Sequence, residues 1–201
     1  MVLLFAVVIG GYLLGSVPVA VLVARAHGFD PRLVGDRNPG FWNMKEQLGP
    51  RYSAPVFVGD LLKGVCAGLL GLLGSACAPG TGMRSVLWTV PDVVLVYAAV
   101  GAAMVGHAWP VFAGFRGGRS ILTFVGGFAV ICPPAFLLGL AVLAATTAAT
   151  RSFAVGARVA VFGAPVLQLL FTPARQVVLT GLLMCLIGLR FGQAALASRR
   201  R

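Results

Sequence analysis

The sequence predicts an all-α, polytopic membrane protein, and three observations lead to this fold class. Apolar residues make up 59% of the 201 residues, charged residues only 10%, and the mean hydropathy is +0.95. A soluble domain carries about 25% charged residues, so this chain lacks the polar groups needed to cover a water-exposed surface. Its apolar runs are also long and continuous, as in membrane-spanning helices, and lack the alternation of β-barrel strands.

The apolar runs give the expected spans in order. Residues 1–24 carry no charge and lack the basic start and cleavage site of a signal peptide, which predicts a retained first span. A polar stretch over 25–52 separates it from the second span. The remaining spans are expected at 54–73, 92–108, two within 120–150, 158–171 and 176–189.

The number of helices depends on the uncharged segment 120–150, which contains Pro133-Pro134. Two spans broken at these prolines give about seven transmembrane helices, with the N-terminus outside and the C-terminus cytoplasmic. That arrangement leaves only Arg84 and Arg175 of the 16 Lys and Arg residues outside. A single span would instead place outside Arg151, Arg158, Arg190, Arg199, Arg200 and Arg201. Because cytoplasmic loops carry the excess of Lys and Arg, seven helices are expected.

We expect a single integral membrane domain over 1–201, with active-site loops at about 25–53 and 109–120 on the cytoplasmic face. The formal net charge is +11. In a membrane protein such cations set the orientation and attract anionic lipid or anionic substrates, so nucleic acid is not an expected partner. Polar groups buried at membrane depth are costly and usually functional. Their convergence on one face predicts one site at the inner surface.

The segment GFRGGRS, Gly114 to Ser120, has three glycines and two arginines directly before a helix. Glycine lets the backbone approach an anion, and the helix that follows aims free N–H groups at it. Arginine adds forked donors that suit phosphate. The ending and spacing of a Walker loop are missing. The segment predicts an anion site, although a short cytoplasmic connector has a similar composition.

Asp60, Lys63 and His107 are the candidate reactive side chains. Asp60 and Lys63 are three residues apart and share one helix face. They can neutralise each other, or the lysine can contact a substrate. His107, at the inner end of the third span, is either an interfacial hydrogen-bonding residue or a neutral imidazole that acts as base or donor.

Asn38, Gly40 and Asn43 fall in the first polar loop, where asparagine commonly stabilises turns. The chain has only five acidic residues and no evident serine–histidine–carboxylate set. Any chemistry must therefore rely on positioning and cationic stabilisation more than on a carboxylate base. We expect no metal and no cofactor.

Together these segments resemble the bacterial acyl-phosphate:glycerol-3-phosphate acyltransferases of the PlsY family. The motifs that carry this resemblance, in chain order, are YLLGSVPVAVLVAR, GDRNPGFWN, GDLLKG and GHAWPVFAGFRGGRSILT. The last of them is the most specific match. The resemblance implies an enzyme of phospholipid biosynthesis in the bacterial plasma membrane. It would transfer a fatty acyl group from acyl phosphate to glycerol 3-phosphate, or a related polyol phosphate, to give lysophosphatidic acid. The alternative is a catalytically impaired paralogue that binds lipid or an anion, or that partners another membrane protein.

The resemblance also implies residue roles. It assigns catalysis to His107, Lys63 and Asn43, with Asp60 in support. Phosphate binding is expected from Asn38, Gly40, Gly114, Arg116, Gly117, Gly118, Arg119 and Ser120. Two acids depart from the family pattern: Asp36 replaces a serine and Glu46 an arginine. We expect Asp36 to pair with Arg37 and Glu46 with Lys45. At the C-terminus, GLRFGQAAL replaces the family's His-Arg-x-Asn-Ile.

Overall fold

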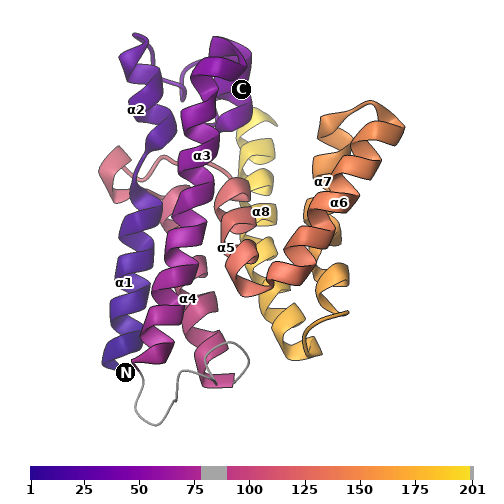
Figure 1. Ribbon diagram of the computed structural model, residues 1–201. Coiled ribbons are helices and arrows are strands. Elements are labelled where there is room, and N and C mark those ends of the chain that lie inside the picture. Colours follow the sequence, from indigo (N-terminus) through magenta and orange to yellow (C-terminus); the bar gives the residue numbers. More distant parts are fainter. Residues whose placement is uncertain (78–89, 200–201) are drawn as a thin grey trace.

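The computed structural model describes residues 1–77 and 90–199 and forms a bundle of helices (Figure 1). Part of the loop expected over 75–91, including Arg84, lies outside the described residues. The helices are α1 Val2–Ser16, α2 Val19–Ala26, α3 Phe41–Ala76, α4 Val90–Ala108, the short 3-10 helix η1 Val111–Ala113, α5 Ile121–Ile131, α6 Pro133–Thr150, α7 Phe153–Gln168 and α8 Ala174–Arg199. The all-α class is confirmed.

Within the described ranges, five helical segments are long and apolar enough to cross a membrane. They are Val2–Ala26, Phe41–Ala76, Val93–Ala113, Pro133–Thr150 and Ala174–Ala197, and two shorter apolar helices, Ile121–Ile131 and Phe153–Gln168, accompany them. In Figure 1 the chain begins and ends at opposite ends of the bundle. A count of seven spans and the assignment of the cytoplasmic end stay predictions.

Close approach of small residues packs α1 and α3 against their neighbours. A β-carbon on Gly11 or Gly15 would overlap the Ala99 or Ala103 carbonyl of α4. On α3, a β-carbon on Gly64 would overlap the backbone of α5. Membrane helices associate through such small-residue contacts because lipid supplies no hydrophobic force between them.

Helix α3 begins at Phe41, well before the start near residue 54 that the sequence suggests. The first polar loop is therefore shorter than expected, and Asn43 lies on the helix. Gly49, with φ 76° and ψ 173°, introduces a kink directly before Pro50. The sequence did not reveal this first part of α3 because it mixes polar and apolar residues and is followed by Gly-Pro, a pair typical of loops.

The expected break at Pro133-Pro134 is confirmed. Helix α5 ends at Ile131 and α6 begins at Pro133, with Cys132 between them at φ −146° and ψ 79°. Proline suits the first helical position because its missing N–H has no partner there in any case. The α6–α7 hairpin lies to one side of the bundle in Figure 1.

A buried polar network ties this hairpin to α4 and α8. The Tyr97 hydroxyl lies 2.9 Å from Thr180 Oγ1 and donates to the Gln176 carbonyl at 2.9 Å. Gln168 Nε2 donates to the Tyr97 oxygen at 2.9 Å, and Thr180 Oγ1 donates to Gln168 Oε1 at 2.6 Å. Because these buried groups satisfy one another, the network fixes the end of α7 against the bundle.

Candidate active site

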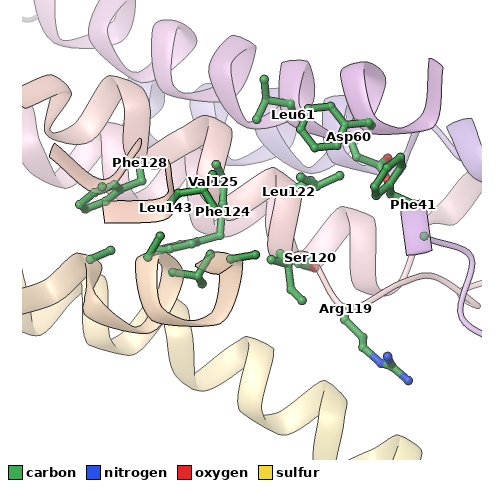
Figure 2. Close-up of a pocket in the computed structure, with 18 of the residues that line it drawn as sticks. Phe41, Asp60, Leu61, Arg119, Ser120, Leu122, Phe124, Val125, Phe128 and Leu143 are labelled. Carbon is green, nitrogen blue, oxygen red and sulfur yellow. The ribbon is translucent and has the colours of Figure 1, made fainter. Parts of the chain in front are cut away.

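A cavity of about 330 Å³ lies between α3, α5, α6 and α7 (Figure 2). Most of its lining is apolar and includes Leu61, Leu122, Phe124, Val125, Phe128 and Leu143. The side formed by α6 and α7 carries small residues: Ala135, Gly139, Ala157, Ala160 and Ala164. The polar lining consists of Asn38, Asp60, His107, Arg119 and Ser120. In Figure 2, Arg119 and Ser120 lie at the opposite end of the cavity from Phe128. The shape and lining suit a molecule with an apolar chain and an anionic head.

Asp60, Lys63 and His107 form a buried cluster where α3 meets α4. Lys63 Nζ lies 2.8 Å from Asp60 Oδ1 and 3.4 Å from His107 Nδ1. The residues are only 2%, 7% and 8% exposed, respectively. The Asp60–Lys63 pair, one of the two alternatives that the sequence left open, is present, and it compensates two charges that are costly to bury singly. The structure adds the histidine as a third member.

The cluster also fixes the orientation of the imidazole. Asp60 Oδ1 lies 3.6 Å from His107 Nδ1, too far for a hydrogen bond, whereas the Lys63 ammonium can donate to Nδ1. A neutral ring that accepts at Nδ1 carries its proton on Nε2. This tautomer, inferred from the hydrogen bonds, makes His107 a donor at Nε2.

The glycine-rich segment closes over this histidine. The Gly117 N–H donates to the Ala108 carbonyl at 3.2 Å, and the Gly118 N–H donates to the His107 carbonyl at 3.0 Å. The sequence predicted that these two N–H groups point at an anion. In the structure both are instead bonded to carbonyls at the end of α4. Glycine is required for another reason: a β-carbon on Gly117 would overlap the His107 carbonyl, and one on Gly118 would overlap Nε2.

The rest of the segment turns the chain and starts α5. Gly114 has φ 63° with open space around it, and Arg116 is exposed beside a second, much smaller pocket that Lys63 and Gly118 also line. Ser120, at φ 62°, donates from Oγ to the Met104 carbonyl at 2.7 Å. Ile121 follows on the cavity wall, and the first N–H groups of a helix have no partner within it. The helix start can therefore still receive an anion.

Arg119 lines the cavity but is engaged by Asp36. Nη1 of Arg119 lies 3.0 Å from Asp36 Oδ2, and the guanidinium carbon lies 4.6 Å from the centre of the Phe191 ring. Its Nε is buried without a hydrogen-bond partner among the described residues. The expected Asp36–Arg37 pair is thus wrong, because the fold brings Arg119 to Asp36.

The other expected pair is also wrong. Lys45 Nζ lies 4.8 Å from the centre of the Trp42 ring, and the exposed Glu46 has no ion pair in the part of the chain that the structure describes. The aromatic ring adjacent to Lys45 offers the ammonium a cation–π contact, which a search for opposite charges in the sequence overlooks.

Asn43 shapes the first loop. Its Nδ2 donates to the carbonyls of Pro31, Val34 and Asn38 at 2.8, 3.1 and 3.1 Å, and the residue is 1% exposed. Asn43 lines neither pocket, whereas Asn38 and Gly40 line the large cavity. Asn43 therefore holds the backbone of Asn38 beside the cavity. It can act on a substrate in the cavity only through Asn38.

Arg32 joins the first loop to η1, directly before the glycine-rich segment. Arg32 Nε donates to Asp30 Oδ1 at 2.8 Å, while Nη1 donates to the Ala113 carbonyl at 3.0 Å. The hydrogen bond from Arg32 lowers the pKa of Asp30 from 3.8 to about 2. The ionised Asp30 carboxylate therefore holds the Arg32 guanidinium, which in turn joins the two loops through Ala113.

Sequence reasoning missed Arg190, which appeared only as one more cytoplasmic cation. From α8, its guanidinium donates to the carbonyls of Gly117 and Gly118. In the sequence it is a single arginine within the apolar C-terminal run CLIGLRFG, in the segment that replaces the family's C-terminal pattern. Nothing local indicates which backbone it reaches.

Comparisons with known proteins agree with this geometry. The family model described as Glycerol-3-phosphate acyltransferase matches residues 5–196. A glycerol-3-phosphate acyltransferase of Rubrobacter xylanophilus is 43% identical over 124 residues, covering 62% of this chain but only 55% of that relative. One from Desulforudis audaxviator is 36% identical over 177 residues, covering 88% of this chain and 81% of the relative.

Solved structures match over nearly the whole chain. The crystal structure of PlsY (YgiH), an integral membrane glycerol 3-phosphate acyltransferase, in its glycerol 3-phosphate form has a TM-score of 0.77 at 26% identity, covering 98% of this chain and 94% of that one. The lysophosphatidic acid form has a TM-score of 0.74 at 25% identity, covering 98% and 93%. The chain therefore belongs to the glycerol-3-phosphate acyltransferase family of integral membrane enzymes.

Proposed function

We propose that this protein transfers a fatty acyl group from acyl phosphate to glycerol 3-phosphate, forming lysophosphatidic acid at the cytoplasmic face of a bacterial plasma membrane. The observation that carries the proposal is one cavity with a long apolar lining and a polar end built from Asp60, His107 and Arg119. The glycerol 3-phosphate and lysophosphatidic acid forms named for the matched structures support the acceptor and the product.

The acyl chain lies along the apolar wall formed by α5, α6 and α7. The fatty chain of a donor in the bilayer is already out of water, so the cavity adds little hydrophobic binding free energy for that chain. Its contribution is position, because it holds the acyl carbon next to the polar end, and correct placement of reactants alone can supply a large part of the rate.

The phosphate of the donor lies at the start of α5. Arg119 offers a buried Nε that has no partner in the described part of the chain, and the first N–H groups of the helix add donors. Asn38, held in place by Asn43, completes this end. The phosphate of the acceptor binds beside Arg116 and Lys63, which both line the smaller pocket.

In the reaction, the acceptor hydroxyl oxygen bonds to the acyl carbon and the bond from that carbon to the phosphate oxygen breaks. Inorganic phosphate leaves with the electron pair and, in net stoichiometry, with the hydroxyl proton. His107 donates from Nε2 to the oxygen on which negative charge develops, while Lys63 holds the ring through Nδ1. No carboxylate base is needed in this scheme.

A second candidate is an anion-binding paralogue without turnover. The Asp36–Arg119 ion pair favours it, because a carboxylate already occupies the guanidinium that the phosphate needs. In this case the cavity binds an acyl phosphate or lysophospholipid and releases it unchanged.

The test uses purified protein in lipid nanodiscs with palmitoyl phosphate and labelled glycerol 3-phosphate. Labelled lysophosphatidic acid is expected, with palmitoyl-coenzyme A inactive as donor and His107→Ala as the control for contaminating enzyme. Binding of palmitoyl phosphate without product would select the paralogue. Product from the coenzyme A thioester alone would refute the proposed donor.

A further inference from the structure

Arg190 of α8 donates hydrogen bonds to the backbone carbonyls of the glycine-rich segment, whose N–H groups are bonded to α4. Its Nε donates to the Gly118 carbonyl at 3.1 Å and its Nη2 donates to the Gly117 carbonyl at 2.9 Å. The guanidinium carbon lies 5.0 Å from the centre of the Trp109 ring, and Nη1 donates to Gln193 Oε1 at 2.8 Å. Four contacts thus fix one partly buried side chain.

The same two glycines are held from the other side by the end of α4. Their N–H groups donate to the carbonyls of Ala108 and His107, so both faces of this short backbone stretch are bonded. Gly118 lies directly against His107 Nε2, and the next residue, Arg119, lines the cavity. The position of Gly118 therefore determines how much space lies beside the imidazole and in which direction the Arg119 side chain extends.

A neighbouring contact on α8 acts on the same segment. Phe191, next to Arg190, places its ring under the Arg119 guanidinium at 4.6 Å. Two successive residues of α8 thus contact three successive residues of the glycine-rich segment. Arg190 itself lines neither pocket, so it reaches any substrate only through the backbone that it holds.

We infer that Arg190 is a positioning residue for acyl transfer, holding Gly117 and Gly118 so that His107 and Arg119 stay aligned with the reacting groups. This role rests on the proposed function. The geometry of the fork matters here as much as its charge, because two adjacent carbonyls accept from two nitrogens of one planar group. Lysine keeps the charge but carries all its donors on one nitrogen, so it cannot reproduce the planar fork.

The test compares Arg190→Lys and Arg190→Ala with Arg199→Lys and Arg199→Ala. Arg199 lies on the same helix and is exposed, so its variants control for charge and for general effects on α8. For both Arg190 variants we expect kcat to fall about tenfold to a hundredfold, the cost of misplacing reactive groups by up to about 1 Å. KM for both substrates should change far less.

Added guanidinium ion should restore turnover to Arg190→Ala, and ammonium should not.

Hydrogen–deuterium exchange supplies a readout that does not need turnover. The amides of Gly117 and Gly118 should exchange faster in Arg190→Lys than in wild type, with Arg199→Lys unchanged. Wild-type kcat in Arg190→Lys, or unchanged exchange over residues 114–120, would overturn the inference. An inactive wild type would refute the proposed function instead, and the exchange result would still decide whether Arg190 holds the segment.

Discussion

Nη1 of Arg119 lies 3.0 Å from Oδ2 of Asp36, so an ion pair joins the first loop to the start of α5 at the polar end of the cavity. The two side chains are 24% and 40% exposed. Water screens such a pair, and partly exposed pairs contribute about 0–1 kcal/mol. An incoming phosphate can therefore displace the carboxylate at small cost, and Asp36 acts as a weak competitor for Arg119.

Replacement of Asp36 by serine should ease donor binding. Without the competing carboxylate, KM for palmitoyl phosphate should fall by up to about fivefold, the equivalent of ~1 kcal/mol, and kcat should stay close to wild type. Steady-state kinetics in nanodiscs measures both. Glu46→Gln, which removes an exposed acid without an ion pair in the described structure, is the matched control and should change neither. A higher KM in Asp36→Ser would mean that the pair organises the site.

His107 should act as a hydrogen-bond donor more than as a base. His107→Ala should lower kcat by about a hundredfold, the usual cost of one lost donor to a developing negative charge. His107→Gln offers an amide N–H and should retain more turnover than His107→Ala. Equal loss in the two variants, with both folded, would contradict the donor role and point to proton abstraction.

Lys63 and Asp60 should show separate structural and catalytic contributions. Lys63→Met leaves the Asp60 carboxylate buried and unpaired, which typically costs about 3–5 kcal/mol, so the yield of folded protein should drop. Adding Asp60→Asn removes the stranded charge and should restore the yield but not the activity. Yield by size-exclusion chromatography and activity by product formation measure the two effects. Recovery of full activity in the double variant would show that Lys63 serves stability alone.

Gly139 on α6 should influence acyl-chain length. It lines the cavity, and a β-carbon there meets only Leu167 Cδ1, at 3.9 Å, so the helix accepts a larger side chain. Gly139→Leu should fill part of the groove and reduce turnover of palmitoyl phosphate more than that of octanoyl phosphate. Competition between the two donors in one reaction measures the ratio.

The matched control for this change lies on the facing helix. Gly163 of α7 has open space around it and does not line the cavity, so Gly163→Leu should leave the ratio unchanged. The same shift in both variants would assign the effect to general disturbance of the hairpin.

Much of the fold followed from local patterns in the sequence. Composition and continuous apolar runs predict the all-α class, and the adjacent prolines predict the break between α5 and α6. The three-residue spacing predicts that Asp60 and Lys63 share one helix face, where they form an ion pair. Each of these depends on residues that are close in the chain. The polar segments also converge as expected, since residues of both loops, 25–53 and 109–120, line one cavity.

The features that the sequence did not predict depend on contacts between distant elements. Asp36 pairs with Arg119 because the fold brings the first loop to the start of α5. Arg190 reaches Gly118 because α8 lies beside the glycine-rich segment. The start of α3 at Phe41 was hidden because the segment 41–48 mixes polar and apolar residues and is followed by Gly49-Pro50, a pair typical of loops. Opposite charges next to each other in sequence proved a poor guide to ion pairs.

The central claim is that one cavity holds both ends of an acyl phosphate, with the chain toward Phe128 and the head at Arg119. Photolabelling tests it most directly, with a palmitoyl phosphate that carries a diazirine at the end of its chain. The account predicts adducts on residues 124–164, lost when lysophosphatidic acid is added in excess and reduced in Gly139→Leu. Adducts that resist this competition and fall on the outer faces of α1 or α8 would contradict it.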